Sequence, residues 1–159
     1  MPAKHQPAGP TAEHAPLELE RFLPYRLSIL SNTISQAIAD DYQRRFDLSV
    51  TEWRVMAVLG RFEGLSAREV AERTAMDKVA VSRALARLVG TGRVSRAVHD
   101  GDRRRSVLNL TDSGWAIHDE IAPTARRRER ELLAKLNAEE QAWLGRILDK
   151  LMPDRDAAP

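Results

Sequence analysis

Residues 77–110 read DKVAVSRALARLVGTGRVSRAVHDGDRRRSVLNL, and this stretch decides the predicted fold. Its first part places apolar residues at three- and four-residue steps, which predicts an amphipathic helix over 77–89. The pattern then changes to two short β-type runs, 94–98 and 106–110, on either side of an Asp-Gly pair that is typical of a hairpin turn. We therefore expect a helix followed directly by a β-hairpin with a basic tip.

Upstream of this stretch, two capping boxes predict two further helix starts, because a Ser is followed three residues later by a Glu at Ser49/Glu52 and at Ser66/Glu69. Residues 74–76 form a short break before the helix at 77. Two short helices joined in this way indicate a helix-turn-helix, which makes the hairpin its wing. Glycines are expected to end two of the helices, Gly60 and Gly64 the one that follows Ser49, and Gly90 and Gly92 the one over 77–89.

Longer amphipathic patterns flank this lobe on both sides. A helix is expected from about Pro24 to Phe46, and Thr111 is expected to cap another, in which Pro123 predicts a kink or a break. A third capping box, Asn137/Glu140, begins the last helix. The predicted fold is mainly α with a small β-hairpin, a winged helix-turn-helix with N- and C-terminal dimerisation helices in the order α–α–α–α–β–β–α–α.

The domain prediction follows from these elements. One domain is expected over 17–152, with the winged lobe at 49–111 and the dimerisation helices at 17–46 and 112–152. Residues 1–16 hold four of the eight prolines and are expected to form a mobile tail, and 153–159 a C-terminal tail.

Composition excludes several classes of protein. The 159 residues include no Cys, which excludes disulfides, thiolate metal sites and thiol-based redox sensing. No apolar run is long enough to span a membrane, and the N-terminus lacks the apolar core of a signal peptide, so a cytoplasmic protein without a membrane partner is expected. The 25 Lys and Arg exceed the 23 Asp and Glu only slightly, so the net charge of +2 names no partner by itself.

The helix over 77–89 has one face suited to reading DNA. With Val81, Ala84, Leu85 and Leu88 in the core, Val79, Ser82, Arg83 and Ala86 point outward and Arg87 lies at the border. In a major groove Arg83 can donate two hydrogen bonds to guanine, Ser82 can meet a base or a phosphate, and Val79 can touch a thymine methyl. The alternative is a packed or merely exposed helix. The helix N-terminus near Asp77 and Lys78 suits phosphate contact, and Ser66 is a further DNA-binding candidate.

The wing tip carries four more candidates, Asp102, Arg103, Arg104 and Arg105. Asp102 and Arg104 are close enough in a hairpin to pair, which would aim the guanidinium into a minor groove, while Arg103 and Arg105 would lie nearer the phosphates. An Arg-rich loop that is merely solvated is the alternative reading.

The wing residues D-x-R-x-x-x-x-x-L-T, from Asp102 to Thr111 and followed by Gly114, resemble the wing signature of the MarR family of bacterial winged-helix transcriptional regulators. The resemblance implies an obligate dimer, two recognition helices in successive major grooves, and a small-molecule ligand that weakens DNA binding. Asp102 and Arg104 fall on the paired positions of the motif, and Ser82 and Arg83 fall where such proteins commonly read bases. The double-stranded DNA partner would be a pseudo-palindromic operator and the protein most simply a repressor.

Two groups of residues are candidates for the other surfaces. The apolar Leu17, Leu19, Phe22 and the 144–151 stripe exceed what a small winged-helix core can bury, which favours a homodimer over coverage of the chain's own core. Small polar residues beside an apolar stripe indicate an effector site, against the alternatives of close helix packing or plain exposure; the candidates are Tyr25, Arg26, Ser28, Ser31, Asn32, Ser35, Trp53 and Arg54. Residues 22–32, FLPYRLSILSN, resemble MarR members linked to aromatic-acid catabolism, some of which sense hydroxycinnamoyl-CoA thioesters. This resemblance implies an aromatic carboxylate or its acyl-CoA as effector.

Two other classes of function are alternatives to a DNA-binding regulator. An enzyme is not expected, because the four His residues form no nucleophilic triad, and neither a phosphate-binding glycine loop nor metal-ligand spacing accompanies them. His118-Asp119-Glu120 points to different faces of a helix, so neither a metal nor another cofactor is expected. A winged-helix protein-interaction module without an effector is the second alternative, against which the three consecutive Arg of the wing argue.

Overall fold

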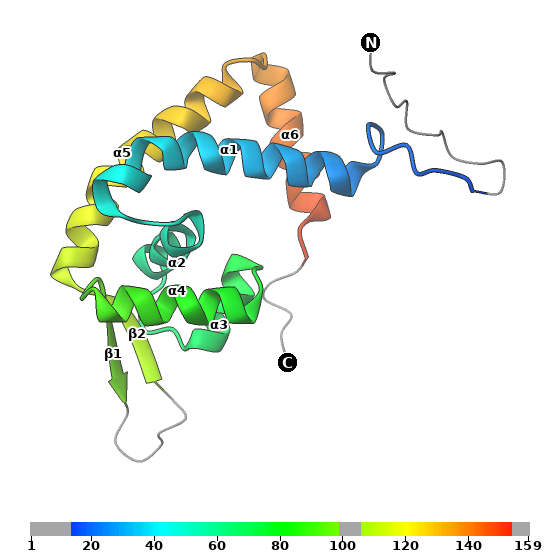
Figure 1. Cartoon of the computed structure of the whole chain (residues 1–159). Helices are drawn as coiled ribbons and strands as arrows, with labels where there is room; N and C mark the ends of the chain where they lie inside the picture. The colour runs from blue at the N-terminus through cyan, green and yellow to red at the C-terminus, as the bar shows by residue number, and fades with distance from the viewer. Residues whose placement is uncertain (1–13, 99–105, 154–159) are drawn as a thin grey trace, which may run out of the picture. The chain divides into compact units, whose positions relative to one another are not determined.

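The computed structural model describes residues 14–98 and 106–153. Its elements, in chain order, are α1 (Leu23–Phe46), α2 (Val50–Arg61), α3 (Ala67–Thr74), α4 (Lys78–Gly90), β1 (Val94–Val98), β2 (Ser106–Leu110), α5 (Asp112–Leu133) and α6 (Ala138–Leu151) (Figure 1). The predicted order of helices and strands is confirmed, and so are the bounds of both strands. The fold is mainly helical with one two-stranded antiparallel hairpin.

The chain divides into two compact units, one ending at Ser35 and the other beginning at Gln36, so that the boundary falls within α1. In the first unit every described residue from 14 to 33 is exposed, including the apolar Leu23, Leu27 and Leu30. In the second unit α1 contributes Ala39 and Tyr42 to a hydrophobic core.

The core of the second unit lies beneath α4. Val81, Ala84, Leu85 and Leu88 are buried, which confirms the predicted inner face of this helix. They share a cluster with apolar residues of α2, α3 and the hairpin, namely Val55, Met56, Leu59, Val70, Val94 and Leu108. Since burying such side chains is the main favourable term in folding, this face fixes which side of α4 is left to solvent.

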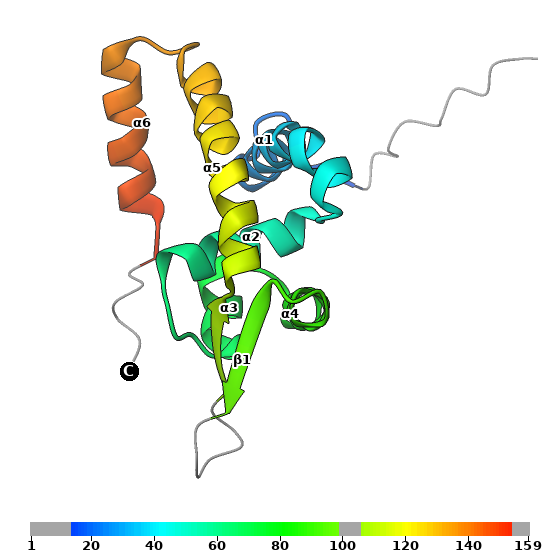
Figure 2. The same ribbon diagram turned by 90° about the vertical axis from the view of Figure 1, so that its left-hand side faces the viewer.

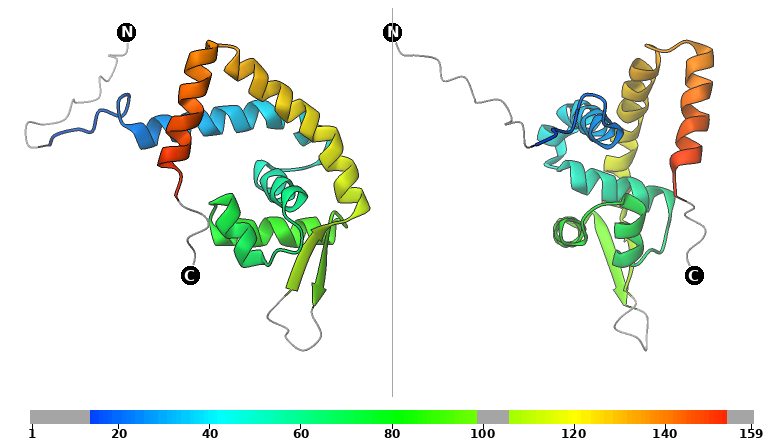
Figure 3. Two further views of the ribbon diagram at one scale, coloured as in Figure 1. Left: turned by 180° about the vertical axis from the view of Figure 1, so that it is seen from behind. Right: turned by 90° about the vertical axis from the view of Figure 1, so that its right-hand side faces the viewer.

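The hairpin is joined to the helix-turn-helix along one edge. Val94 pairs with Leu110 and Val98 with Ser106. The N–H of Leu108 donates to the carbonyl of Leu65 at 2.8 Å, and the N–H of Gly64 donates to Oδ1 of Asn109 at 2.7 Å. From this attachment the hairpin runs past α3 and α4, as both views of Figure 3 show.

Of the glycine predictions, the one for the end of α2 needs correction and the one for the end of α4 does not. Gly60 does not end α2, which continues to Arg61. The absence of a side chain at Gly60 instead leaves room for the ring of His118, because a Cβ here would lie 2.7 Å from His118 Nε2. Gly64 lies after the helix, in the left-handed region at φ +71°. Gly90 is the last residue of α4, and Gly92, at φ +72°, takes the left-handed position after it.

A kink or a break is predicted at Pro123, and the break does not occur, because α5 continues through this residue. The missing N–H of Pro123 leaves the carbonyl of Asp119 without its helical partner. Both residues are exposed, so water can satisfy that carbonyl. The capping boxes of α2, α3 and α6 are all formed as predicted, and Thr111 caps α5.

The chain reverses between α5 and α6 (Figure 2). The side-chain amide of Gln141 donates to the carbonyls of Leu133 and Leu136, at 2.9 and 3.1 Å, and holds this turn. None of the residues of α6 is buried. No helix among residues 14–98 and 106–153 has the length and apolar character needed to cross a membrane.

Candidate nucleic-acid interface

The outward face of α4 carries the predicted set of small and basic side chains. Val79 is 57% exposed, and Ser82, Arg83 and Ala86 are exposed as well. A single exposed Val is common on protein surfaces, but this one lies beside small and basic side chains. A face that combines methyl groups, a hydroxyl and a guanidinium has the chemistry to fit the edges of base pairs.

The N-terminus of α4 is closed by its own cap. Oδ1 of Asp77 accepts hydrogen bonds from the N–H groups of Val79 and Ala80, each at 3.0 Å. These are the N–H groups that would otherwise meet a phosphate, and the carboxylate would repel one. The phosphate contact predicted for this helix terminus stays a prediction, and the exposed side chain of Lys78 is the donor that remains for it.

Ser66 has a structural task of its own. Its hydroxyl accepts the N–H of Glu69 at 3.2 Å and donates to Oε2 of Glu69 at 2.7 Å. This capping box starts α3, and a hydroxyl so used has little left for a phosphate. The DNA contact of Ser66 stays a prediction.

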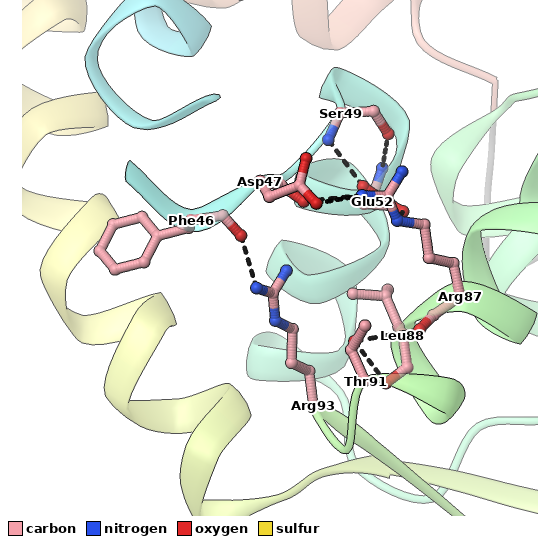
Figure 4. A network of polar contacts seen from close by, with 8 residues as sticks. All are labelled: Phe46, Asp47, Ser49, Glu52, Arg87, Leu88, Thr91 and Arg93. Atoms are coloured by element: carbon pink, nitrogen blue, oxygen red, sulfur yellow. Dashed lines mark hydrogen bonds and ion pairs between the residues drawn. The ribbon is translucent and has the colours of Figure 1, made fainter. Parts of the chain in front are cut away.

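Arg87 lies at the edge of the recognition face and points toward the α1–α2 corner, the residues Phe46–Ser49 that join the two helices (Figure 4). Its Nε lies 3.1 Å from Oε1 of Glu52, and its Nη2 donates to Oδ2 of Asp47 at 2.6 Å. Sequence patterns could not reveal this network, because Glu52 reads only as half of a capping box and Asp47 only as a helix break.

The wing is described only at its stem. The candidates Asp102, Arg103, Arg104 and Arg105 lie outside the described residues. On the stem, Ser95, Arg96, Ala97 and Val98 are all exposed on β1, whereas β2 buries Leu108 and Leu110. The stem is thus anchored through β2.

The junction between wing and α5 explains the Leu-Thr-x-x-Gly part of the motif. Thr111 donates from its N–H to the carbonyl of Arg93 at 3.1 Å and from its hydroxyl to the carbonyl of Gly92 at 2.6 Å. The same hydroxyl accepts the N–H of Gly114 at 3.1 Å, which caps α5. Leu110 is buried beneath this turn.

The effector candidates fall in both units. Tyr25, Arg26, Ser28, Ser31 and Asn32 are exposed along α1, and Ser35 is half-buried. Trp53 and Arg54 lie on α2 in the second unit, each half-buried, and Nη1 of Arg54 approaches the sulfur of Met76 at 3.8 Å.

Four rings form what we call the aromatic cluster, of which the sequence prediction named only Trp53. The ring centroids of Tyr42 and Trp53 are 5.8 Å apart, those of Trp53 and His118 5.7 Å, and those of His118 and Trp115 5.1 Å. The hydroxyl of Tyr42 is buried and has no hydrogen-bond partner among the described residues. Burial raises the pKa of Tyr42 to about 12; the charge of Glu52 adds to the shift and that of Arg54 opposes it. A buried polar group without a hydrogen-bond partner is uncommon in a folded protein.

The predicted dimer residues are exposed. Leu17, Leu19 and Phe22 lie in the first unit, and the α6 stripe comprises Leu144, Ile147, Leu148 and Leu151. Since α6 buries no residue, its stripe does not cover the chain's own core. Among the described residues no group of three or more His, Asp or Glu is arranged to hold a metal ion.

Comparisons with known proteins agree with this geometry. A family model described as MarR family matches residues 46–105. The HTH-type transcriptional repressor Rv2887 of Mycobacterium tuberculosis is 28% identical over 144 residues, which are 90% of this chain and 98% of that protein.

Two solved structures are similar over most of their length. A cysteine-to-serine mutant of MarR from Escherichia coli, complexed with operator DNA, is 26% identical with a TM-score of 0.72, over 87% of this chain and 100% of that one. The PcaV transcriptional regulator of Streptomyces coelicolor, in complex with its natural ligand, is 25% identical with a TM-score of 0.71, over 92% of this chain and 100% of that one.

Proposed function

We propose that the chain is a MarR-family winged-helix transcriptional regulator, and not an enzyme, that binds a pseudo-palindromic operator as a homodimer and releases it on binding a small aromatic acid or its CoA thioester. The family model over residues 46–105, the curated relatives and the solved neighbours support the regulator part of this proposal. The observation that carries the proposal is the outward face of α4. Its inner residues are all buried, which leaves Val79, Ser82, Arg83 and Ala86 on the opposite side to meet DNA.

The basic and small residues of α4 and the wing would make different kinds of contact with DNA. Arg83 is long enough to reach guanine in the major groove, and Val79 and Ala86 offer methyl groups to thymine. Lys78 would hold a phosphate beside the groove, and the wing arginines would contact the minor groove and the backbone. Phosphate contacts then give affinity, whereas the α4 face gives sequence preference.

Two copies are needed for a specific site. One recognition helix covers only a few base pairs, and dimeric regulators place two of them about 34 Å apart, one turn of the duplex. The exposed α6 stripe and the apolar residues at 17–22 would supply the dimer surface. An apolar face of this kind on every copy is self-complementary about a twofold axis, which matches the symmetry of a palindrome.

The effector proposal rests on the chemistry near α2. Flat rings of the aromatic cluster offer stacking surfaces, Arg54 offers a guanidinium to a carboxylate, and the buried hydroxyl of Tyr42 offers a polar partner. The polar residues of α1 are further candidates. PcaV was solved in complex with its natural ligand, so a regulator similar to this chain does bind a ligand.

The proposal is tested by selection and displacement. The purified protein is used to select duplexes from a pool of random sequence, and the enriched duplex is titrated in the presence of aromatic acids and their CoA thioesters. We expect an enriched palindrome and its release by at least one compound, with measurable heat of binding. If a duplex is enriched but no compound releases it or gives a heat of binding, the effector part of the proposal is wrong. Failure of the pool to enrich would favour the interaction module.

A further inference from the structure

The recognition helix is tied to the start of α2 through a buried carboxylate. Glu52 is 3% exposed, and both of its oxygens are used. Oε2 accepts the backbone N–H of Ser49 at 2.7 Å, and Oε1 lies 3.1 Å from Nε of Arg87 on α4 (Figure 4). One side chain therefore belongs both to the cap of α2 and to a contact with the recognition helix.

The same guanidinium also holds the end of α1. Nη2 of Arg87 donates to Oδ2 of Asp47 at 2.6 Å and to its backbone carbonyl at 3.3 Å. Just after α4, the guanidinium of Arg93 donates to the carbonyl of Phe46. Carbonyls at a helix C-terminus lack helical partners and carry the negative end of the dipole, so these two arginines complete the cap of α1.

We infer that Arg87 is a positioning residue for DNA binding: held by Glu52 and Asp47, it fixes the rotation of α4 against the α1–α2 corner and so sets where Ser82 and Arg83 point. This inference rests on the proposed function, in which α4 reads DNA. It replaces the direct DNA contact predicted from sequence for Arg87.

The geometry favours positioning over phosphate contact. A guanidinium has five N–H donors on three nitrogens, and two of these nitrogens, Nε and Nη2 of Arg87, already meet two carboxylates and a carbonyl of its own chain. Its side chain is 49% exposed, whereas that of Glu52 is 4% exposed. Pulling Arg87 away to a phosphate would leave the Glu52 carboxylate buried with one fewer partner, which is costly.

The two roles predict opposite results for Glu52→Gln. Removing a negative charge close to the DNA surface should strengthen attraction to phosphates if Arg87 is merely restrained by Glu52. If Arg87 instead positions α4, the same substitution loosens the helix and weakens binding. Glu140→Gln is the matched control, because Glu140 has the same place in the capping box of α6 but no contact with Arg87.

The experiment measures affinity for the duplex that the wild-type protein selects, across a series of salt concentrations, for Arg87→Met, Glu52→Gln and the double variant. We expect each single variant to weaken binding about tenfold, the double variant to be no weaker than Arg87→Met alone, and the salt slope to stay at the wild-type value. Glu140→Gln should bind like the wild type. Arg87→Lys, which keeps the charge but loses the fork, should fall between wild type and Arg87→Met.

Three results would overturn the inference. A salt slope lowered by about two units in Arg87→Met, one for each copy in the dimer, together with tighter binding by Glu52→Gln, would make Arg87 a phosphate contact. Unchanged DNA affinity in both Arg87→Met and Glu52→Gln would mean that Arg87 only stabilises the fold. Additive losses of affinity in the double variant would mean that Arg87 and Glu52 do not act together. If Arg87→Met does not fold, Glu52→Gln and Arg87→Lys still decide the question. A wild-type protein that binds no DNA would refute the proposed function itself.

Discussion

The carbonyl oxygen of Arg93 lies 2.1 Å from the point where a Cβ on Gly114 would stand. Gly114 is buried in the first turn of α5, directly against the backbone that leads into the wing. The glycine of the wing motif is therefore required by a close approach of two backbone segments and not by an unusual dihedral angle.

Gly114→Ala should lower the free energy of unfolding by roughly 2–3 kcal/mol, because backbone atoms on both sides must move apart. Urea denaturation measures the loss. Gly145→Ala on α6 is the control, since nothing lies within 4 Å of its Cβ position, and it should raise stability by about 0.5–1 kcal/mol. Equal stabilities for the two alanine variants would contradict the described junction.

Arg83→Ala should relax base preference, because the exposed guanidinium of Arg83 is the long donor on the α4 face. Binding to the selected duplex should weaken by about 1–3 kcal/mol, while binding to an unrelated duplex changes little. Competition between the two duplexes measures the ratio. Arg104→Ala in the wing should instead weaken both and lower the salt slope. If Arg83→Ala keeps the wild-type selectivity between the two duplexes, Arg83 does not read the bases and another surface does.

Leu148→Glu should convert the proposed dimer to monomer, because Leu148 lies at the centre of the α6 stripe and a carboxylate there would be desolvated in an interface. Sedimentation velocity gives the oligomeric state, and DNA affinity should fall with it. Lys150→Glu on the same exposed helix controls for the added negative charge and should leave the dimer intact. If the Leu148→Glu variant remains dimeric, α6 does not form the dimer interface.

Tyr42→Phe should separate stability from effector binding. The hydroxyl is buried without a partner in the described chain, so its removal should leave the free energy of unfolding unchanged or raise it by about 1 kcal/mol. Calorimetric titration with the compound that releases DNA should show affinity reduced about tenfold if the hydroxyl meets the effector. A loss of stability with unchanged effector affinity would show that the hydroxyl has a different, structural partner.

Tyr42 also predicts a pH dependence. Burial raises its pKa from 10.0 to about 12 in the folded protein, whereas the unfolded chain titrates at the lower value. The unfolded state therefore loses its proton first, and stability is fully present below pH 10 and falls as the pH rises toward 12. Wild type and Tyr42→Phe compared by denaturation across this range should diverge, the wild type losing more. Parallel curves would argue against a buried hydroxyl.

Local rules in the sequence were sufficient for most of the fold. The capping boxes at Ser49, Ser66 and Asn137 are formed, and both strands have their predicted bounds, because cap and turn chemistry depends on neighbouring residues only. The burial of Val81, Ala84, Leu85 and Leu88 followed from helical period alone.

Features that depend on distant residues could not be predicted in this way. Gly60 is predicted from sequence to end a helix, yet a glycine is needed there because the ring of His118 on α5 packs against it. Arg87 reads as a border residue of a DNA-binding face, yet its partners are Asp47 and Glu52 on other elements. Such contacts are decided by tertiary packing, on which periodicity carries no information.

The most direct test of the account is the salt dependence of DNA binding by the purified wild-type protein. The proposed dimer, in which two wings and two Lys78 side chains contact phosphates, should lose affinity on the order of 10³-fold between about 50 and 200 mM salt. It should also bind the selected duplex at a much lower protein concentration than random DNA. Affinity that is flat with salt and equal for all duplexes would contradict it.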